Sequence, residues 1–236
     1  MIDRTGLRPL LRMRPLFFEM NETVLTLKDI RAAYGGEQAL NGVSVEVHAG
    51  SVLGIRGENG AGKSTLMGVM AGVVKPDSGE RIAAPGLEGG ICYVPQDISL
   101  YPSLTGRQNL NFWAEIYGMR GKQKSTRVSY LLKLMDLEDK AGKRVETYSG
   151  GMKRRLNMAA ALVVTPKLLL LDEPTVGADA ASVAVMLDSI RRMRARGTAV
   201  VLISHLQGEL ESVCDRIITL EDGVISGTLV RQGARE

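Results

Sequence analysis

A glycine-rich loop constrains this chain most, because it lies between an apolar run of strand length and a helical pattern. The apolar run is residues 52–55, and apolar residues at spacings of three and four follow Lys63, as in a helix. Four residues fit the pattern G-x-x-x-x-G-K-[ST] of a phosphate-binding loop: Gly57, Gly62, Lys63 and Ser64. Since that motif needs a strand before it and a helix after it, the context predicts phosphate binding within an α/β fold.

Each part of this loop has a physical role in binding phosphate. Glycines let backbone N–H groups approach phosphate oxygens, and the helix N-terminus adds unpaired donors and a positive dipole end. Lys63 is expected to lie along the β- and γ-phosphates, and the Ser64 hydroxyl to bind Mg²⁺. The alternative is an ordinary glycine-rich turn, since 27 of the 236 residues are glycine. The other loop residues expected to line the nucleotide are Asn59, Gly60, Ala61 and Thr65.

The composition is that of a globular chain, long enough for one α/β domain with a small inserted lobe. It is 44% hydrophobic and 24% charged, and its apolar stretches, such as residues 167–172, are of strand length and too short to span a membrane. The net charge is only +4, and no basic groove interleaved with aromatics is evident, so no nucleic-acid partner is expected. Cys92 and Cys214 are too few for a disulfide scaffold, and we expect buried thiols in a reducing compartment.

The first residues differ from the rest of the chain. Residues 1–21 carry four arginines interrupted by two prolines, with no long apolar segment as in a secretory signal. We expect a flexible basic extension, or a domain whose natural start is near Met20; a membrane-surface anchor is the alternative. A single domain is expected over residues 22–236.

Strand and helix patterns alternate along that domain. Residues 24–27 and 40–47 alternate in polarity, as antiparallel strands with one wet face do. Residues 104–137 carry apolar side chains at helical spacing and predict a helical lobe inserted between strands. Continuously apolar runs predict buried parallel strands at residues 90–94, 167–172 and 198–204.

Two acidic residues end the apolar run 167–172. Asp172 and Glu173 lie where an α/β sheet presents its ligands, at the carboxyl end of a strand. Asp172 is expected to hold Mg²⁺, and Glu173 to orient or deprotonate an attacking water. Two acids after a strand often form only a polar loop, but the phosphate-binding loop favours the catalytic interpretation.

With these motifs in this order, residues 22–230 resemble the ATP-binding subunit of an ATP-binding cassette (ABC) transporter. The resemblance implies an α/β phosphate-loop ATPase with a mixed, mostly parallel core sheet and an N-terminal antiparallel β subdomain. An α-helical subdomain is expected at about 98–155, between core segments at about 22–97 and 156–230. ATP and Mg²⁺ are the expected ligands, and hydrolysis of ATP the expected reaction.

The resemblance also assigns residues that carry little signal alone. Tyr34 matches the aromatic residue that stacks on adenine, and His205 matches the switch histidine near the γ-phosphate. Gln96 matches the glutamine between the core and the helical lobe, which senses the γ-phosphate and Mg²⁺. The family signature is matched by Ser149, Gly150 and Gly151, and the acid of the dimer-contacting loop by Asp179.

The signature implies a composite site in a head-to-tail dimer. Ser149 and the glycine amides of one subunit would close on the γ-phosphate held by Lys63 of the other. The resemblance further implies a second ATP-binding subunit, identical or not, and a separate transmembrane permease. The subunit would then be cytoplasmic, held on the inner face of the cell membrane through the permease.

Shorter sequence motifs indicate which type of ABC transporter the chain resembles. The signature Tyr148-Ser-Gly-Gly-Met152, followed by Lys-Arg-Arg, resembles exporters of the drug and antibiotic type, whose permease is a separate ABC-2-like chain. The sequence of residues 57–67 is more similar to that of carbohydrate importers, so the ATPase subunit of an importer is the alternative. An ABC ATPase acting on nucleic acid or ribosomes is less favoured, because no coiled-coil or zinc insertion is visible. Residues 97–117 gather the only tryptophan, one of three phenylalanines and two of six tyrosines, and we expect this segment to contact a helix of the permease. The expectation rests mainly on Leu100 and Tyr101, because the alternative for Phe112 and Trp113 is that they fill the core of the helical lobe.

Overall fold

The computed structural model describes residues 19–34 and 36–231, and the fold is that of these residues. Most of the expected basic extension, residues 1–21, lies outside them. That extension and the division of the domain near residues 98 and 155 stay predictions.

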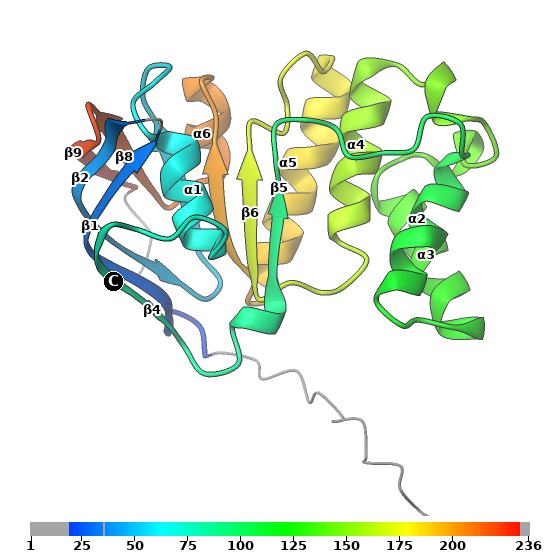
Figure 1. Cartoon of the computed structure of the whole chain (residues 1–236). Helices are drawn as coiled ribbons and strands as arrows, with labels where there is room; N and C mark the ends of the chain where they lie inside the picture. The colour runs from blue at the N-terminus through cyan, green and yellow to red at the C-terminus, as the bar shows by residue number, and fades with distance from the viewer. Residues whose placement is uncertain (1–18, 35, 232–236) are drawn as a thin grey trace, which may run out of the picture.

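An antiparallel sheet forms one end of the molecule (Figure 1). Its strands are β1 (Thr23–Tyr34), β2 (Glu37–His48) and β4 (Ser78–Ala83), in the order β2-β1-β4. The alternation in β2 buries Val43, Val45 and Val47 and exposes the residues between them. Tyr34 reads as part of a turn-rich link, because Gly35 and Gly36 follow it, but it is the last residue of β1 and pairs with Glu37.

A six-stranded sheet lies next to it and has the strand order β5-β6-β7-β3-β8-β9. All neighbouring strands are parallel except β8 and β9, which confirms a mixed, mostly parallel core sheet. The strands are β3 (Val52–Arg56), β5 (Ile91–Val94), β6 (Leu168–Asp172), β7 (Ala199–Ile203), β8 (Arg216–Glu221) and β9 (Val224–Val230).

Helices cover both faces of this sheet, which is why β6 and β7 are buried throughout. Leu168 and Leu170 pack into a core shared with α1 and the antiparallel sheet, whereas Leu169 and Leu171 pack into a core shared with α4 and α5. The covering helices are α1 (Lys63–Ala71), α4 (Gly150–Ala161), α5 (Ala180–Ala195) and α6 (Gln207–Val213).

A helical region lies beside α4, at the end of the molecule opposite the antiparallel sheet (Figure 1). Its first helix is capped by Thr105, whose side chain accepts from the backbone N–H of Gln108 in a capping box. Its elements are α2 (Gly106–Ile116), α3 (Gly121–Leu134) and two 3₁₀ turns, η2 (Glu138–Lys140) and η3 (Val145–Thr147); a third turn, η1 (Glu88–Gly90), precedes β5.

The parallel strands β3, β5, β6 and β7 end at the same edge of the sheet, because they run in the same direction. Each is followed there by a segment with candidate site residues. Within the described ranges 19–34 and 36–231, no helix has the length and apolar character that crossing a bilayer requires.

Candidate active site

The phosphate-binding loop depends on two glycines that lie against neighbouring backbone. A Cβ on Gly57 would be 2.2 Å from the carbonyl oxygen of Leu220, and a Cβ on Gly62 would be 2.2 Å from that of Ala39. Gly62 is also the N-cap of α1 and has a φ of 96°, a left-handed conformation that glycine adopts without strain. These close contacts hold the loop between β3 and α1, so the first turn of α1 faces the space in front of the loop.

Lys63, the first residue of α1, lies across this loop. Its side chain is buried, and Nζ donates to the carbonyl oxygens of Gly57, at 2.9 Å, and Glu58, at 2.8 Å. Burial lowers the pKa of the ammonium group, while Glu173 and Asp172 act in the opposite direction. An ammonium group has three N–H donors, so the two carbonyls use two of them.

Glu173 follows β6 and is held between two other segments. Its Oε1 lies 2.5 Å from Nε2 of His205, which follows β7, and its Oε2 accepts from Nε2 of Gln96, which follows β5, at 3.1 Å. The Glu173 side chain is 11% exposed, and its backbone φ is 48°. The structure therefore brings together three residues that are far apart in the sequence, all at the carboxyl edge of the sheet.

Asp172 is the last residue of β6 and is more deeply buried. The hydroxyl group of Tyr93 donates to its Oδ2 at 3.4 Å, and burial raises the pKa of Tyr93 to about 12. Burial also raises the pKa of Asp172, whereas a hydrogen bond from Ser64 lowers it and the charge of Glu173 raises it. Ser64 and Asp172, expected to share a metal ion, are thus in contact.

The side-chain oxygens of this site suit a Mg²⁺ ion that is bound together with a nucleotide. The hydroxyl group of Ser64, the amide oxygen of Gln96 and the carboxylate of Asp172 are oxygen ligands, and Mg²⁺ usually binds few protein groups besides substrate phosphates. Among the residues that the structure describes, no group of three or more His, Cys, Asp and Glu side chains could hold a metal alone. The site fits an ion that arrives with phosphate.

A cavity of about 690 Å³ opens in front of the loop. Nine predicted residues line it, whereas Gly57, Ala61 and Asp172 do not; Ala61 and Asp172 are buried. Tyr34 is described only in its backbone, and its side chain lies outside the described part of the chain. The lining residues are Glu37, Gln38, Ala39, Asn59, Gly60, Gly62, Lys63, Ser64, Thr65, Gln96, Glu173, Val176 and His205.

The signature residues form a separate cluster that does not line this cavity. Exposed Ser149 is the N-cap of α4, where its Oγ accepts from the backbone N–H of Met152 at 3.3 Å. Asp179 is the N-cap of α5 and accepts from the N–H of Ser182 at 2.8 Å, which lowers its pKa. A Cβ on Gly151 would be 2.7 Å from Oδ2 of Asp179, so the starts of α4 and α5 are in contact.

A family model described as ABC transporter matches residues 40–176, more than half of the chain. This chain belongs to the ABC transporter family. Linearmycin resistance ATP-binding protein LnrL of Bacillus subtilis is 39% identical over 209 residues, covering 85% of this chain and 67% of the relative. Nod factor export ATP-binding protein I of Rhizobium etli is 36% identical, covering 85% and 66%. This ABC subunit thus spans about two thirds of the length of these relatives.

Solved structures agree with this assignment. An ATP-binding subunit of an ABC transporter superposes with a TM-score of 0.78 and 27% identity, covering 88% of this chain and 90% of that one. A dimeric ATP-binding cassette bound to ADP and Pi gives a TM-score of 0.78 and 26% identity, covering 89% and 99%. The predicted family and fold class are confirmed, and the chain is an ABC ATP-binding subunit homologous to exporter-type proteins.

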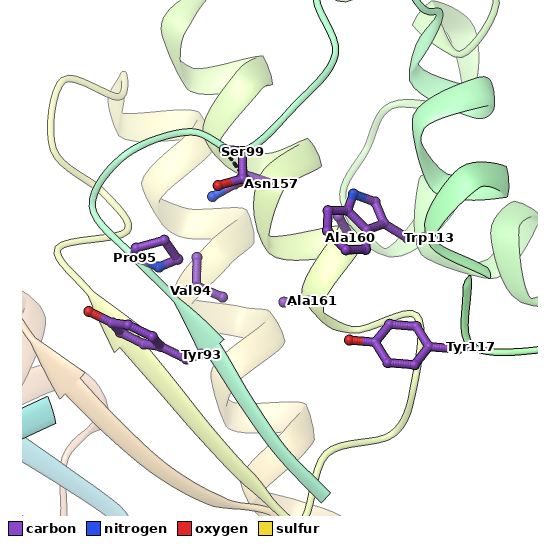
Figure 2. Close-up of a pocket in the computed structure, with 9 residues that line it drawn as sticks. All are labelled: Tyr93, Val94, Pro95, Ser99, Trp113, Tyr117, Asn157, Ala160 and Ala161. Atoms are coloured by element: carbon purple, nitrogen blue, oxygen red, sulfur yellow. Dashed lines mark hydrogen bonds between the residues drawn. The ribbon is translucent and has the colours of Figure 1, made fainter. Parts of the chain in front are cut away.

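This ABC subunit has a second cavity, of about 150 Å³, behind the Gln96 segment (Figure 2). Asn157 of α4 and Ser99 meet at its rim, where Oδ1 of Asn157 accepts from the N–H of Ser99 at 3.1 Å. The indole Nε1 of Trp113 is buried and has no hydrogen-bond partner among the described residues. The cavity is lined by Tyr93, Val94, Pro95, Ser99, Trp113, Tyr117, Asn157, Ala160 and Ala161.

Two charged residues near the site have no role predicted from the sequence. Arg154 of α4 donates to the carbonyl oxygens of Gln96 and Val176, the latter at 3.2 Å, and so joins the signature helix to the cavity wall. Glu209 of α6 is buried behind His205. The arginines after the signature are visible as a motif, whereas Glu209 has no local signal, since a glutamate in a helix is usually exposed.

Proposed function

We propose that this ABC subunit binds ATP with Mg²⁺ and hydrolyses it, and that hydrolysis drives an exporter-type permease on a separate chain. The observation that carries the proposal is the Glu173 carboxylate, fixed between Gln96 and His205 at the edge of the cavity that contains Lys63. The names of the relatives, which include linearmycin resistance and Nod factor export, support export over import.

In the proposed reaction, the loop amides and the Lys63 ammonium hold the β- and γ-phosphates in the cavity. Glu173 orients the attacking water and accepts its proton, and His205, in contact with Glu173, holds the carboxylate in place and faces the γ-phosphate. Ser64, Gln96 and Asp172 would hold Mg²⁺. When bound, that ion supplies positive charge that stabilises the transferred phosphoryl group.

The signature is proposed to act on the partner's nucleotide. Ser149, Gly150 and Gly151 are at the N-terminus of α4, where amide donors and the helix dipole favour an anion, yet they do not line their own cavity. In a head-to-tail dimer they would complete the site of the second subunit, with Asp179 beside them. The solved relative described as dimeric and bound to ADP and Pi supports the dimer that this arrangement requires.

The second cavity is the proposed docking site for the permease. It lies between β5, α2 and α4, and its lining includes residues on both sides of Gln96 in the chain (Figure 2). At about 150 Å³ it can take a side chain of a permease helix that lies across the surface around it, and such a helix would sense changes at the active site. Leu100, expected to contact the partner, packs against the core, whereas Tyr101 and Tyr117 are 45% and 49% exposed. Docked in this way, the subunit would lie on the cytoplasmic face of the membrane.

The hydrolysis step is tested by Glu173→Gln, which keeps the shape of the side chain and removes the base. Turnover should fall by roughly 10²- to 10⁴-fold, a barrier increase of about 3–5 kcal/mol, while ATP still binds. The matched control is Glu138→Gln, the same change at an exposed position in the helical region. Steady-state phosphate release and binding of a fluorescent ATP analogue measure the two properties, and turnover near wild type would refute the assignment.

A further inference from the structure

A buried carboxyl group lies behind the Glu173–His205 pair. Glu209 is only 7% exposed, and its Oε2 accepts hydrogen bonds from the hydroxyl groups of Thr175 and Ser204, both at 2.7 Å. Both hydroxyl residues are buried as well. One carboxyl oxygen therefore joins the segment after β6 to the segment after β7.

These two segments carry the reactive pair. Thr175 is two residues after Glu173, and Ser204 immediately precedes His205. Ser204 Oγ also accepts from the backbone N–H of Leu206, at 3.1 Å, so both chain neighbours of His205 are connected to the Glu209 carboxyl group.

The surroundings argue against a packing role for this side chain. The neighbouring buried residues of α6, Leu210 and Val213, are apolar, as residues that only fill a core are. The second carboxyl oxygen of Glu209, Oε1, is buried without a hydrogen-bond partner among the described residues. Burying an unsatisfied acceptor is unfavourable, so an apolar side chain would serve stability better.

We propose that Glu209 is a positioning residue, which sets the contact between Glu173 and His205 by holding Thr175 and Ser204 on one oxygen. The inference rests on the proposed ATPase function, because it assigns Glu209 to the geometry of that reaction. Glu209 does not line the nucleotide cavity, so it is expected to affect the chemical step and leave nucleotide binding unchanged.

The first test is Glu209→Ala in the full chain. We expect kcat to fall about 10- to 100-fold, as small displacements of catalytic groups produce, with KM and the Kd of a fluorescent ATP analogue within about twofold of wild type. Glu209→Gln retains one oxygen that accepts both hydroxyl groups and should restore kcat to within about threefold. The control is Glu211→Ala, an exposed glutamate on the same helix, which should behave as wild type.

The second test separates positioning from a general structural role. If Glu209 acts through His205, then Glu209→Ala should lower kcat by less than about twofold in a His205→Ala background, because the two changes disrupt one interaction. If Glu209→Ala does not fold, Thr175→Val and Ser204→Ala replace it. Each removes one hydroxyl group and should lower kcat without changing KM.

Three results would overturn the inference: wild-type kcat in Glu209→Ala, effects of Glu209→Ala and His205→Ala that multiply, or no recovery in Glu209→Gln. Failure of the proposed function is a different outcome, because the wild-type chain would then lack ATP turnover or Glu173→Gln would keep it. An inactive Glu173→Gln together with a fully active Glu209→Ala refutes only the positioning role.

Discussion

Two alanine substitutions in the phosphate-binding loop test how it is held. Gly60 and Gly62 both have left-handed backbone, with φ of 85° and 96°. Alanine in this conformation costs about 1–2 kcal/mol at either position. A Cβ on Gly60 meets nothing within 4 Å, whereas a Cβ on Gly62 would be 2.2 Å from the carbonyl oxygen of Ala39 and 3.1 Å from Cδ2 of Leu40.

The overlap at Gly62 involves backbone, so β2 or the first turn of α1 must move. Overpacking of this kind costs roughly 1–3 kcal/mol, and Gly62→Ala should therefore lower the free energy of unfolding by roughly 2–5 kcal/mol in total. Gly60→Ala should lower it by only about 1–2 kcal/mol. Because Lys63 directly follows Gly62, its contacts with Gly57 and Glu58 should also be disturbed, which weakens nucleotide binding.

Urea denaturation measures this difference as a lower midpoint for Gly62→Ala than for Gly60→Ala, with the same slope m. Binding of a fluorescent ATP analogue to the folded variants provides the second readout. Equal unfolding free energies for the two variants would show that the close contact with Ala39 does not restrict the loop, and would refute this account of why glycine is required at 62.

The sequence predicted the elements whose signals are local. The phosphate-binding loop, the apolar strand before Asp172 and the strand before His205 all have patterns that short-range physics explains. The meeting of Glu173 with Gln96 and His205 could be expected because parallel strands end at one edge of a sheet. The roles assigned to these residues stay predictions until activity is measured.

Other features depend on tertiary contacts and had no local signal. Residues 75–79 read as a turn, yet Ser78 and Gly79 begin strand β4. The first residues of β4 are polar, and pairing with β1 makes this segment a strand. Glu209 is an ordinary helical glutamate until the fold places Thr175 and Ser204 beside it. Arg154 belongs to a visible run of basic residues, but its contacts with distant carbonyl groups also depend on the fold.

Two further predictions concern the docking site and the thiols. The double variant Tyr101→Ser and Tyr117→Ser should keep ATP turnover but lose co-purification with the permease; unchanged assembly and transport would place the docking site elsewhere. Burial raises the pKa of Cys92 to about 11 and of Cys214 to about 12, from an ordinary 9.0. Alkylation of both thiols at pH 8 should therefore be slow until urea unfolds the chain. The free energy of unfolding should fall as pH rises from about 9 to 11, because the thiols ionise at lower pH in the unfolded chain than in the folded one. Fast alkylation of the folded chain would contradict the burial of the thiols.

We propose that two copies of this site close on ATP and reopen when the ATP is hydrolysed. Light scattering of Glu173→Gln with and without ATP tests it most directly, because this variant should bind ATP and be unable to leave the closed state. We expect a monomer without nucleotide and a dimer with ATP, and we expect no dimer when Ser149→Arg is added at the signature. A variant that binds ATP fully and stays monomeric, or a dimer that forms regardless of Ser149, would contradict it.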